Sequence, residues 1–183
     1  MSNTIVNLTH SHLDLIEQIS HMLFECFQEF APDWLPTLND CREEILESLE
    51  PQRVSRVLVD EKQNVLGWVG AIPHVNVWEI HPIAVSPTVQ RKGYGELLVN
   101  DIAELAKSGG AVAIWAGTSD ETNATSLSRA DLYKDPFGAL QNITAKPNHP
   151  IHFWQKAGFT LVGIMPDEEG FGKPGIHFAR RIV

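Results

Sequence analysis

The sequence Gln90-Arg91-Lys92-Gly93-Tyr94-Gly95 lies between an apolar segment, Trp78 to Val85, and an amphipathic run, Glu96 to Lys107. This order predicts a strand, a glycine-containing turn and a helix. The first backbone N–H groups of a helix lack partners within it and lie at the positive end of its dipole. Two glycines let an anion approach this backbone, while Arg91 and Lys92 add positive charge. We therefore expect the turn to bind a pyrophosphate.

The spacing of the glycines narrows the choice of ligand. A nucleotide P-loop requires Gly-x-x-x-x-Gly-Lys-Ser/Thr, and a dinucleotide fingerprint requires a third glycine where this chain has Leu98. Neither pattern fits. The order Gln-x-x-Gly-x-Gly resembles the coenzyme A loop of the GNAT superfamily of N-acetyltransferases. Taken alone, the same residues would also suit an ordinary glycine turn before a helix.

Length and composition predict one soluble domain over residues 1–183. A chain of this size can bury a core without support from disulfides or metals. No apolar run approaches the roughly 20 residues that cross a bilayer, and no signal-peptide pattern precedes residue 12. Cys26 and Cys41 lie in segments with helical patterns, so we expect two reduced thiols. We expect a cytoplasmic protein without membrane contact.

The chain is acidic, with a net charge of −9. Binding to nucleic acid needs a basic surface, so this charge argues against a nucleic-acid partner. The acidity would suit a cationic ligand, although it also serves solubility by itself.

Apolar periodicity predicts the order of elements along the chain. The pattern predicts helices over 11–30, from Asn39 or Asp40 to 50, over 96–107 and over 149–156, and strands over 53–59, 64–72, 77–85, 111–116, 159–164 and 176–182. In the third helix, Leu98, Ile102 and Leu105 share one face. Two helices, an antiparallel meander, a strand-turn-helix-strand crossover and a closing helix with strands predict a mixed α/β fold with a mostly antiparallel sheet flanked by helices.

Further blocks of sequence strengthen the resemblance. The segment from His152 to Phe159 is similar to the helix-to-strand signature found late in the superfamily. Seven blocks resemble one branch, the aminoglycoside 6′-N-acetyltransferases: Gly70-Ala71-Ile72-Pro73, Trp78-Glu79-Ile80-His81-Pro82, Gly117-Thr118-Ser119-Asp120, Thr125-Ser126-Leu127-Ser128, Asp131-Leu132-Tyr133, Val162-Gly163-Ile164-Met165-Pro166 and Lys173-Pro174. This resemblance implies a homodimer that transfers the acetyl group of acetyl-coenzyme A to the 6′-amino group of aminoglycosides and so confers resistance.

Such chemistry requires a group that removes a proton, because an alkyl amine arrives as an ammonium ion without a lone pair. The alternation of a strand places Glu79, His81, Ile83 and Val85 on one face. The resemblance assigns Glu79 to the substrate amine, as an anchor or as a base acting through a water. The alternatives are a solvated Glu79 and a His81 that only hydrogen-bonds locally.

Pro82 cannot donate to a sheet ladder, so its strand must be an edge, bulged, or splayed from a neighbour. The resemblance implies a splay, in which the pantetheine arm pairs with backbone groups of Ile83 to Val85. A backbone N–H at Ile83 or nearby would then polarise the thioester carbonyl.

The resemblance also assigns the remaining coenzyme contacts. The expected contacts are Ile83, Ala84, Val85, Gln90, Arg91, Lys92, Gly93, Tyr94, Gly95, Glu96 and Trp154. For Trp154 the alternative is an aromatic residue of the core. Trp154 stands where many family members have a tyrosine that protonates the leaving sulfur, and an indole is not a usable acid. Tyr94, Tyr133 or water would be the donor instead, or the coenzyme leaves as a thiolate. We assign no general acid.

A polycationic sugar needs carboxylates and a flat ring against it. We expect Trp34, Glu79, Asp120 and Asp131 to contact the acceptor, while the run 167–169 reads as a solvated turn.

His149 and His152 lack a third ligand, so we predict no metal site. Neither cysteine lies in a nucleophile motif, which favours direct transfer in a ternary complex. The rival hypotheses are transfer to another amine, such as a polyamine, peptide N-terminus or protein lysine, and a non-catalytic sensor of acyl-coenzyme A.

Overall fold

The computed structural model describes residues 3–29 and 31–183. Its elements in chain order are β1 (Thr4–Asn7), α1 (Leu13–Phe27), α2 (Leu38–Glu47), β2 (Val54–Val59), β3 (Val65–Pro73), β4 (Val77–Val85), the 3₁₀ turn η1 (Pro87–Val89), α3 (Tyr94–Ser108), β5 (Ala113–Ser119), the 3₁₀ turn η2 (Ser126–Arg129), α4 (Pro136–Gln141), α5 (Ile151–Lys156), β6 (Thr160–Met165) and β7 (Gly175–Arg181).

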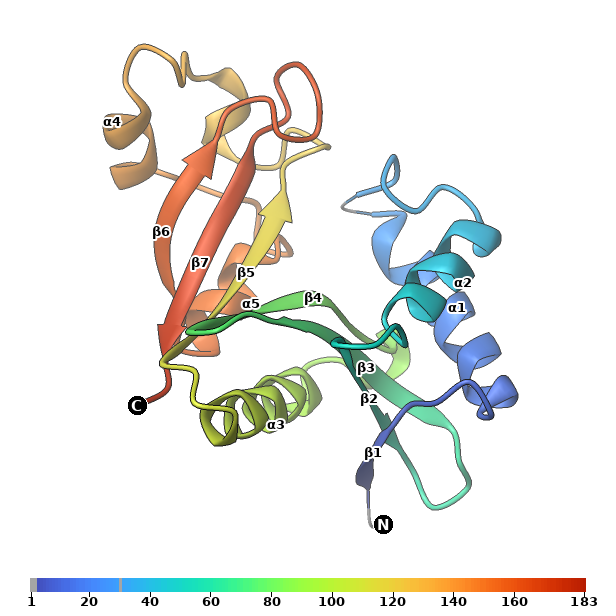
Figure 1. Cartoon of the computed structure of the whole chain (residues 1–183). Coiled ribbons are helices and arrows are strands. Elements are labelled where there is room, and N and C mark those ends of the chain that lie inside the picture. The colour runs from blue at the N-terminus through green and yellow to red at the C-terminus, as the bar shows by residue number, and fades with distance from the viewer. Residues whose placement is uncertain (1–2, 30) are drawn as a thin grey trace.

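The strands form one sheet in the order β1-β2-β3-β4-β5-β7-β6. Only β4 and β5 run parallel, joined by the crossover through α3, and every other neighbouring pair is antiparallel. Figure 1 shows α1 and α2 on one side of β2–β4, α3 on the other side, and β5–β7 rising away as a second arm. The predicted mixed α/β fold with a mostly antiparallel sheet is confirmed.

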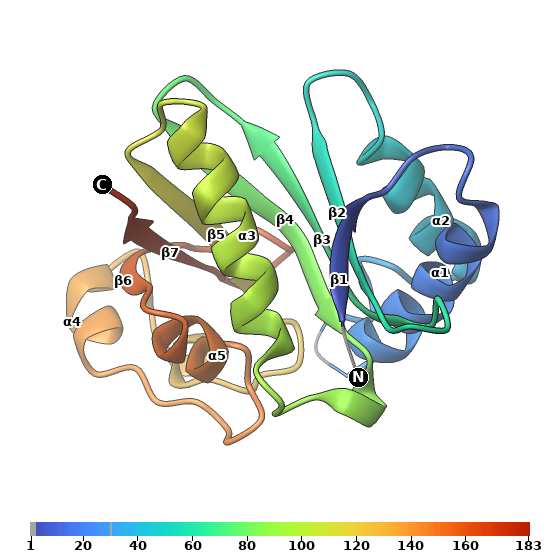
Figure 2. The ribbon, with the colours of Figure 1, turned by 90° about the horizontal axis from the view of Figure 1, so that it is seen from below.

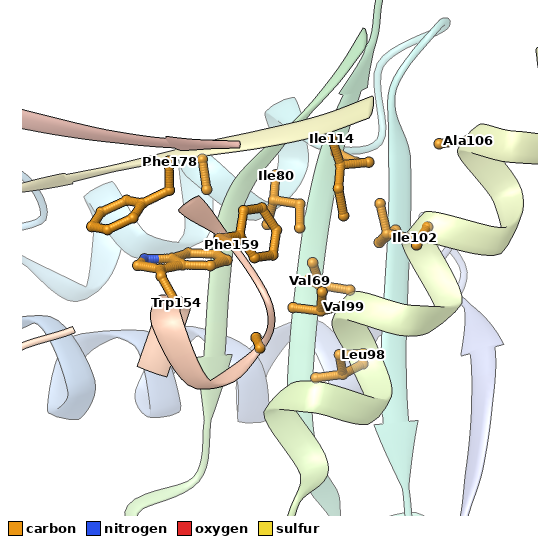
Figure 3. Close-up of a cluster of buried hydrophobic side chains, with 14 of the residues drawn as sticks. Val69, Ile80, Leu98, Val99, Ile102, Ala106, Ile114, Trp154, Phe159 and Phe178 are labelled. Carbon is orange, nitrogen blue, oxygen red and sulfur yellow. The ribbon is translucent and has the colours of Figure 1, made fainter. Parts of the chain in front are cut away.

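One core lies between α3, α5 and the sheet. Figure 2 shows α3 lying across the strands with α5 beside it. Leu98, Val99 and Ile102 of α3 are fully buried, and Trp154 brings an aromatic group to the same core (Figure 3). Leu105, which we expected on this face, is 36% exposed. The face is turned slightly from the predicted one, because Ala103 and Ala106 complete it instead.

A second core lies on the opposite side of β2 and β3. Apolar residues of α1 and α2, among them Ile16 and Ile45, pack on Val57 and Trp68. The indole N–H of buried Trp68 donates to Ser55 Oγ at 2.9 Å, so its one polar group is satisfied. This packing fixes α2 and the loop before it close to β4.

The N-cap of α2 was predicted at the wrong residue, and two short elements were missed. The N-cap of α2 is Thr37, neither Asn39 nor Asp40, and it forms a capping box. Thr37 Oγ1 accepts from the N–H of Asp40 at 3.2 Å, while the Asp40 carboxylate accepts from the N–H of Thr37 at 2.9 Å. The short elements β1 and α4 were not predicted, because four and six residues carry too little periodicity to stand out.

Candidate functional site

A cleft of about 590 Å³ lies between the two arms of the sheet. Its walls come from β4, from the turn that leads into α3, from the end of β5, from α5, and from the end of α1 with the loop that follows it. Segments far apart in sequence thus meet at the point where β4 leaves β5.

The parting of these two strands creates the cleft. β4 pairs with β5 only from Val77 to Ile80, opposite Ala113 to Ala116. Beyond Ile80, β4 continues along β3 while β5 continues along β7, so the next residues of both strands line the cleft. The predicted splay is therefore present, and Ile83, Ala84 and Val85 lie on its wall as expected.

A bulge bends β4 at the same point. Val69 pairs with Ile83 and Ala71 pairs with Ile80, so His81 and Pro82 together face Gly70 alone. A Cβ atom at position 70 would overlap the carbonyl oxygen of His81, and only glycine leaves room for the bulge. Pro82, which has no N–H to donate, occupies the bulge itself.

The glycine turn has the shape of an anion site. Arg91 and Gly93 have positive φ angles of 65° and 87°, and Gly93 precedes α3 without any side-chain cap. The first N–H groups of α3 are therefore left for a ligand at the positive end of the helix dipole. Gln90 ties the turn to β4, because its side-chain amide donates to the Val85 carbonyl at 3.1 Å.

The two glycines of the turn serve different purposes. A Cβ atom at Gly93 would meet no protein atom within 4 Å and would project into open space, where the positive φ disfavours other residues. A Cβ atom at Gly95 would lie 2.7 Å from the Phe153 ring, so this glycine lets α5 approach α3. Arg91 and Glu96 line the cleft, whereas Lys92 is exposed outside its wall.

The aromatic residues considered for the leaving group fall in different places. Trp154 lies both in the core and on the cleft wall, packed against Phe159 at 5.0 Å between ring centroids. Tyr94 lines the cleft, and its hydroxyl accepts from Asn3 at 2.9 Å. Tyr133 is 76% exposed and donates to Asp167 away from the cleft, which removes it as a candidate acid.

Glu79, His81 and Ile83 all line the cleft. Glu79 Oε1 lies 3.9 Å from His81 Nδ1. Burial raises the pKa of Glu79 above its ordinary value, while His74 and Arg53 act in the opposite direction, and burial lowers the pKa of His81. The indole of Trp34 lies 5.5 Å from the imidazole, so this predicted acceptor residue also joins the group.

Several carboxylates gather along the cleft. Glu121, Glu168 and Glu169 line the cleft together with Glu79. Glu168 lies 3.0 Å from His177 Nε2, and Glu121 accepts from the backbone N–H of Asp33 at 3.0 Å. We define these four glutamates as the acidic wall. We had expected the turn 167–169 to be solvated and had not singled out Glu121.

The structure does not support the acceptor role that we predicted for Asp120 and Asp131. Asp120 is 1% exposed, and its carboxylate accepts from the N–H groups of Ala124 and Thr125, so it organises the loop after β5. Asp131 is exposed on a turn, where it accepts from the N–H of Lys134 outside the cleft wall. Asp120 is thus buried, whereas the next residue, Glu121, lines the cleft.

Metal ligands, membrane spans and reactive thiols can be examined within residues 3–29 and 31–183. No group of three His, Cys, Asp or Glu residues there is arranged to hold a metal ion, and no helix is long and apolar enough to cross a membrane. Both cysteines are free thiols. Burial raises the pKa of Cys26 to about 12 and of Cys41 to about 11, so neither is a thiolate nucleophile.

Comparisons with known proteins agree with this geometry. A model described as the acetyltransferase (GNAT) family matches residues 16–139. No match to the sequence was found among curated proteins.

Solved structures resemble the chain over nearly its whole length. An aminoglycoside 6′-N-acetyltransferase complexed with coenzyme A is 30% identical, with 98% of this chain and 97% of that chain covered and a TM-score of 0.87. An aminoglycoside 6′-N-acetyltransferase from Enterococcus faecium is 31% identical over the same shares, with a TM-score of 0.82. An aminoglycoside 6′-acetyltransferase of type Ii is 26% identical over the same shares, with a TM-score of 0.69.

Proposed function

The chain belongs to the acetyltransferase (GNAT) family, and from this premise we propose that it transfers the acetyl group of acetyl-coenzyme A to the 6′-amino group of aminoglycosides. The reaction is direct attack of the amine on the thioester within a ternary complex. Resistance to these antibiotics would follow, because the acetylated amine no longer carries a positive charge.

The donor half of the proposal rests on the glycine turn and the splay. The pyrophosphate binds the first N–H groups of α3, with Gly93 leaving space and Arg91 adding charge. The pantetheine arm enters between β4 and β5, alongside Ile83, Ala84 and Val85. A backbone N–H at or near Ile83 polarises the thioester carbonyl, a contribution of about 3 kcal/mol in other enzymes.

The acceptor half rests on one observation, the acidic wall. Among the described residues, five glutamates line the cleft, and four of them form the acidic wall. The cleft-lining cations Arg91 and Lys156 belong to the donor end, where Lys156 pairs with the fifth glutamate, Glu96, at 3.0 Å. Amines spread over a sugar scaffold meet separate carboxylates in such a cleft, while Trp34 offers a ring face beside His81. The similarity to aminoglycoside 6′-N-acetyltransferases selects this class among polycations.

Glu79 anchors the reacting ammonium beside His81, so that either the carboxylate or the imidazole takes up its proton, directly or through a water. The elevated pKa that burial gives this carboxylate makes it a better base near neutral pH. The nitrogen lone pair then forms the new bond to the acetyl carbon, and the sulfur leaves with the electrons of the broken C–S bond. No side chain is assigned as the acid for the thiolate.

The test is thiol release from acetyl-coenzyme A with tobramycin or kanamycin as acceptor, beside polyamines and peptides. We expect efficient turnover on aminoglycosides and none on analogues with a 6′-hydroxyl group. The acidic wall would also suit other cationic amines, so turnover confined to polyamines or peptides would keep the chemistry and reassign the acceptor. Tight coenzyme binding without any turnover would favour the sensor hypothesis.

Two further proposals concern the protein in the cell. We propose a homodimer, which light scattering on the purified protein tests at micromolar concentration. We propose a cytoplasmic location, where the coenzyme is available, and cell fractionation tests it. A monomer or a membrane-bound fraction would contradict these proposals without affecting the reaction.

A further inference from the structure

His81 lies between two carboxylates that come from different elements. Its Nδ1 atom is 3.9 Å from Glu79 Oε1 on its own strand, and its Nε2 atom is 3.7 Å from Glu44 Oε1 on α2. Glu79 and His81 line the cleft, whereas Glu44 is not among the residues that line it. Each ring nitrogen therefore faces its own glutamate.

Glu44 is in an unusual environment for a glutamate on an amphipathic helix. Its side chain is only 10% exposed, and its Oε1 atom is buried without a hydrogen-bond partner among the residues that the structure describes. Burial raises the pKa of Glu44 to about 7, helped by Glu47 and opposed by Arg53. An unpaired buried carboxylate costs free energy, so its retention calls for a role that the resting contacts do not supply.

We propose that Glu44 is a positioning residue for His81: it accepts a hydrogen bond from Nε2–H and so leaves the lone pair of Nδ1 directed toward the amine held at Glu79. The remaining gap of 3.7 Å closes by a small side-chain rotation or through one water. A buried carboxylate that fixes the tautomer of a histidine and stabilises its charged form is a known way to make imidazole a better base. This inference rests on the proposed acetyl transfer.

The proton balance is simple. The ammonium bound at Glu79 gives one proton to Nδ1 of His81, and the freed lone pair attacks the acetyl carbon. As the C–S bond breaks, the nitrogen loses a second proton, which the departing thiolate takes up directly or through water, so that the amide and free coenzyme A are formed. His81 becomes an imidazolium between two carboxylates, with Nε2–H still shared with Glu44. The imidazolium then releases its proton to water after the product leaves, which restores the starting state.

Other charges also act on this group. Burial lowers the pKa of His81, Arg53 lowers it further and Glu47 raises it. Glu79 in turn senses His74, Arg53, His177 and Glu168. Glu44 is the carboxylate nearest to Nε2. Its substitution therefore tests the effect of this one carboxylate on His81, with the other charged groups left in place.

The first experiment follows His81 in the free enzyme by long-range ¹H–¹⁵N NMR at varied pH. We expect the Nε2–H tautomer in the wild type. Glu44→Gln keeps the shape but removes the ionisable carboxyl, and should lower the pKa of His81, because the imidazolium of His81 and the ionised carboxylate of Glu44 stabilise each other across the gap of 3.7 Å. Glu44→Met also removes the hydrogen-bond acceptor for Nε2–H, so His81 should lose its preference for the Nε2–H tautomer in this variant.

The second experiment measures kcat and KM against pH with tobramycin. Glu44→Gln should lower kcat by roughly 10- to 100-fold, less than the 10²–10⁴-fold that a whole general base contributes. The acid limb should move to lower pH, with KM for coenzyme unchanged. Glu43→Gln is the matched control, because Glu43 is exposed on the same helix and accepts only from Asn39 at 2.8 Å.

A double variant separates positioning from general damage. In a His81→Asn background, Glu44→Gln should cost little further activity, because the residue through which Glu44 acts is already gone. Additive losses, or an unchanged tautomer and pKa of His81 in both Glu44 variants, would overturn the proposal. The NMR measurement needs no turnover, so it tests the positioning role of Glu44 even if the acceptor is not an aminoglycoside.

Discussion

Gly70 and His81 face each other across the β3–β4 pair so closely that a single added carbon atom at position 70 would overlap the His81 carbonyl oxygen. The missing side chain on β3 makes room for the bulge on β4 that carries His81 and Pro82 to the cleft. The position of the proposed proton acceptor thus depends on a residue of the neighbouring strand that does not itself line the cleft.

We therefore expect Gly70→Ala to cost about 1–3 kcal/mol of unfolding free energy, as overpacking of a buried site does. It should also lower kcat and leave the KM for coenzyme nearly unchanged, because His81 moves while the glycine turn does not. Denaturant unfolding and steady-state kinetics measure both effects. Gly163→Ala in β6 is the control, since a Cβ atom there meets nothing within 4 Å. Equal effects of the two variants would contradict this account of the bulge.

Much of this arrangement was predictable from local patterns. The strand Val77–Val85 was predicted with its observed bounds, because β-branched and apolar residues alternate there between clear turn signals. Pro82 predicted a break in the hydrogen bonds between strands, because proline has no backbone N–H to donate. The glycine turn followed from its place between a strand and an amphipathic helix.

The rest depends on contacts between distant segments. Nothing near Glu44 in the sequence shows that α2 will bury its carboxylate against β4. Asp120 and Glu121 are adjacent acids, and only the loop geometry decides that the first is buried and the second lines the cleft. Side-chain direction in an irregular loop has no period from which it can be read.

Gly93→Val should raise the Kd for acetyl-coenzyme A at least about tenfold, which corresponds to 1.4 kcal/mol. The added side chain would project into the open space that the pyrophosphate needs, from a backbone with φ of 87°. Isothermal titration calorimetry measures the affinity. Gly110→Val is a matched control, because Gly110 has the same φ of 87° and open surroundings at the other end of α3. If Gly110→Val weakened coenzyme binding equally, backbone strain would be the cause and the anion-site assignment would fail.

Glu79→Gln should lower kcat by roughly 10²-fold or more while coenzyme binding stays unchanged. Burial raises the pKa of Glu79, so the protonated, inactive form should persist to higher pH than for an ordinary glutamate. The acid limb of kcat/KM in the wild type should reflect this, and a pH series of initial rates measures it. Glu104→Gln, on the exposed side of α3, should behave as the wild type. Full activity of Glu79→Gln would remove this carboxylate from the mechanism.

Gly175→Ala should weaken binding of the acceptor rather than binding of the coenzyme. A Cβ atom at Gly175 would overlap the Glu168 carboxylate, which would have to leave its place beside His177. We expect KM for tobramycin to rise about two- to fivefold, the scale of a partly exposed ion pair, in both Gly175→Ala and Glu168→Gln. Steady-state kinetics with either substrate varied separates the two KM values. A rise in the coenzyme KM alone would place Glu168 outside the acceptor site.

The pKa of Glu44 links its proposed role to the stability of the fold. Its value of about 7 in the folded protein lies above the ordinary value of 4.5, so the folded state keeps a proton that the unfolded state loses between these pH values. The unfolding free energy of the wild type should therefore fall as the pH rises through this window and stay low above it.

Glu44→Gln cannot ionise, so its stability relative to the wild type should rise from pH 5 to pH 8 even though its activity falls. A functional residue held in an unfavourable state commonly shows this opposition between stability and activity. Urea unfolding at several pH values between 5 and 8 measures the difference, with Glu43→Gln as the control at an exposed position of the same helix. A stability difference that does not change with pH would mean that the Glu44 carboxyl titrates normally, and that its burial beside His81 does not disfavour its ionised form.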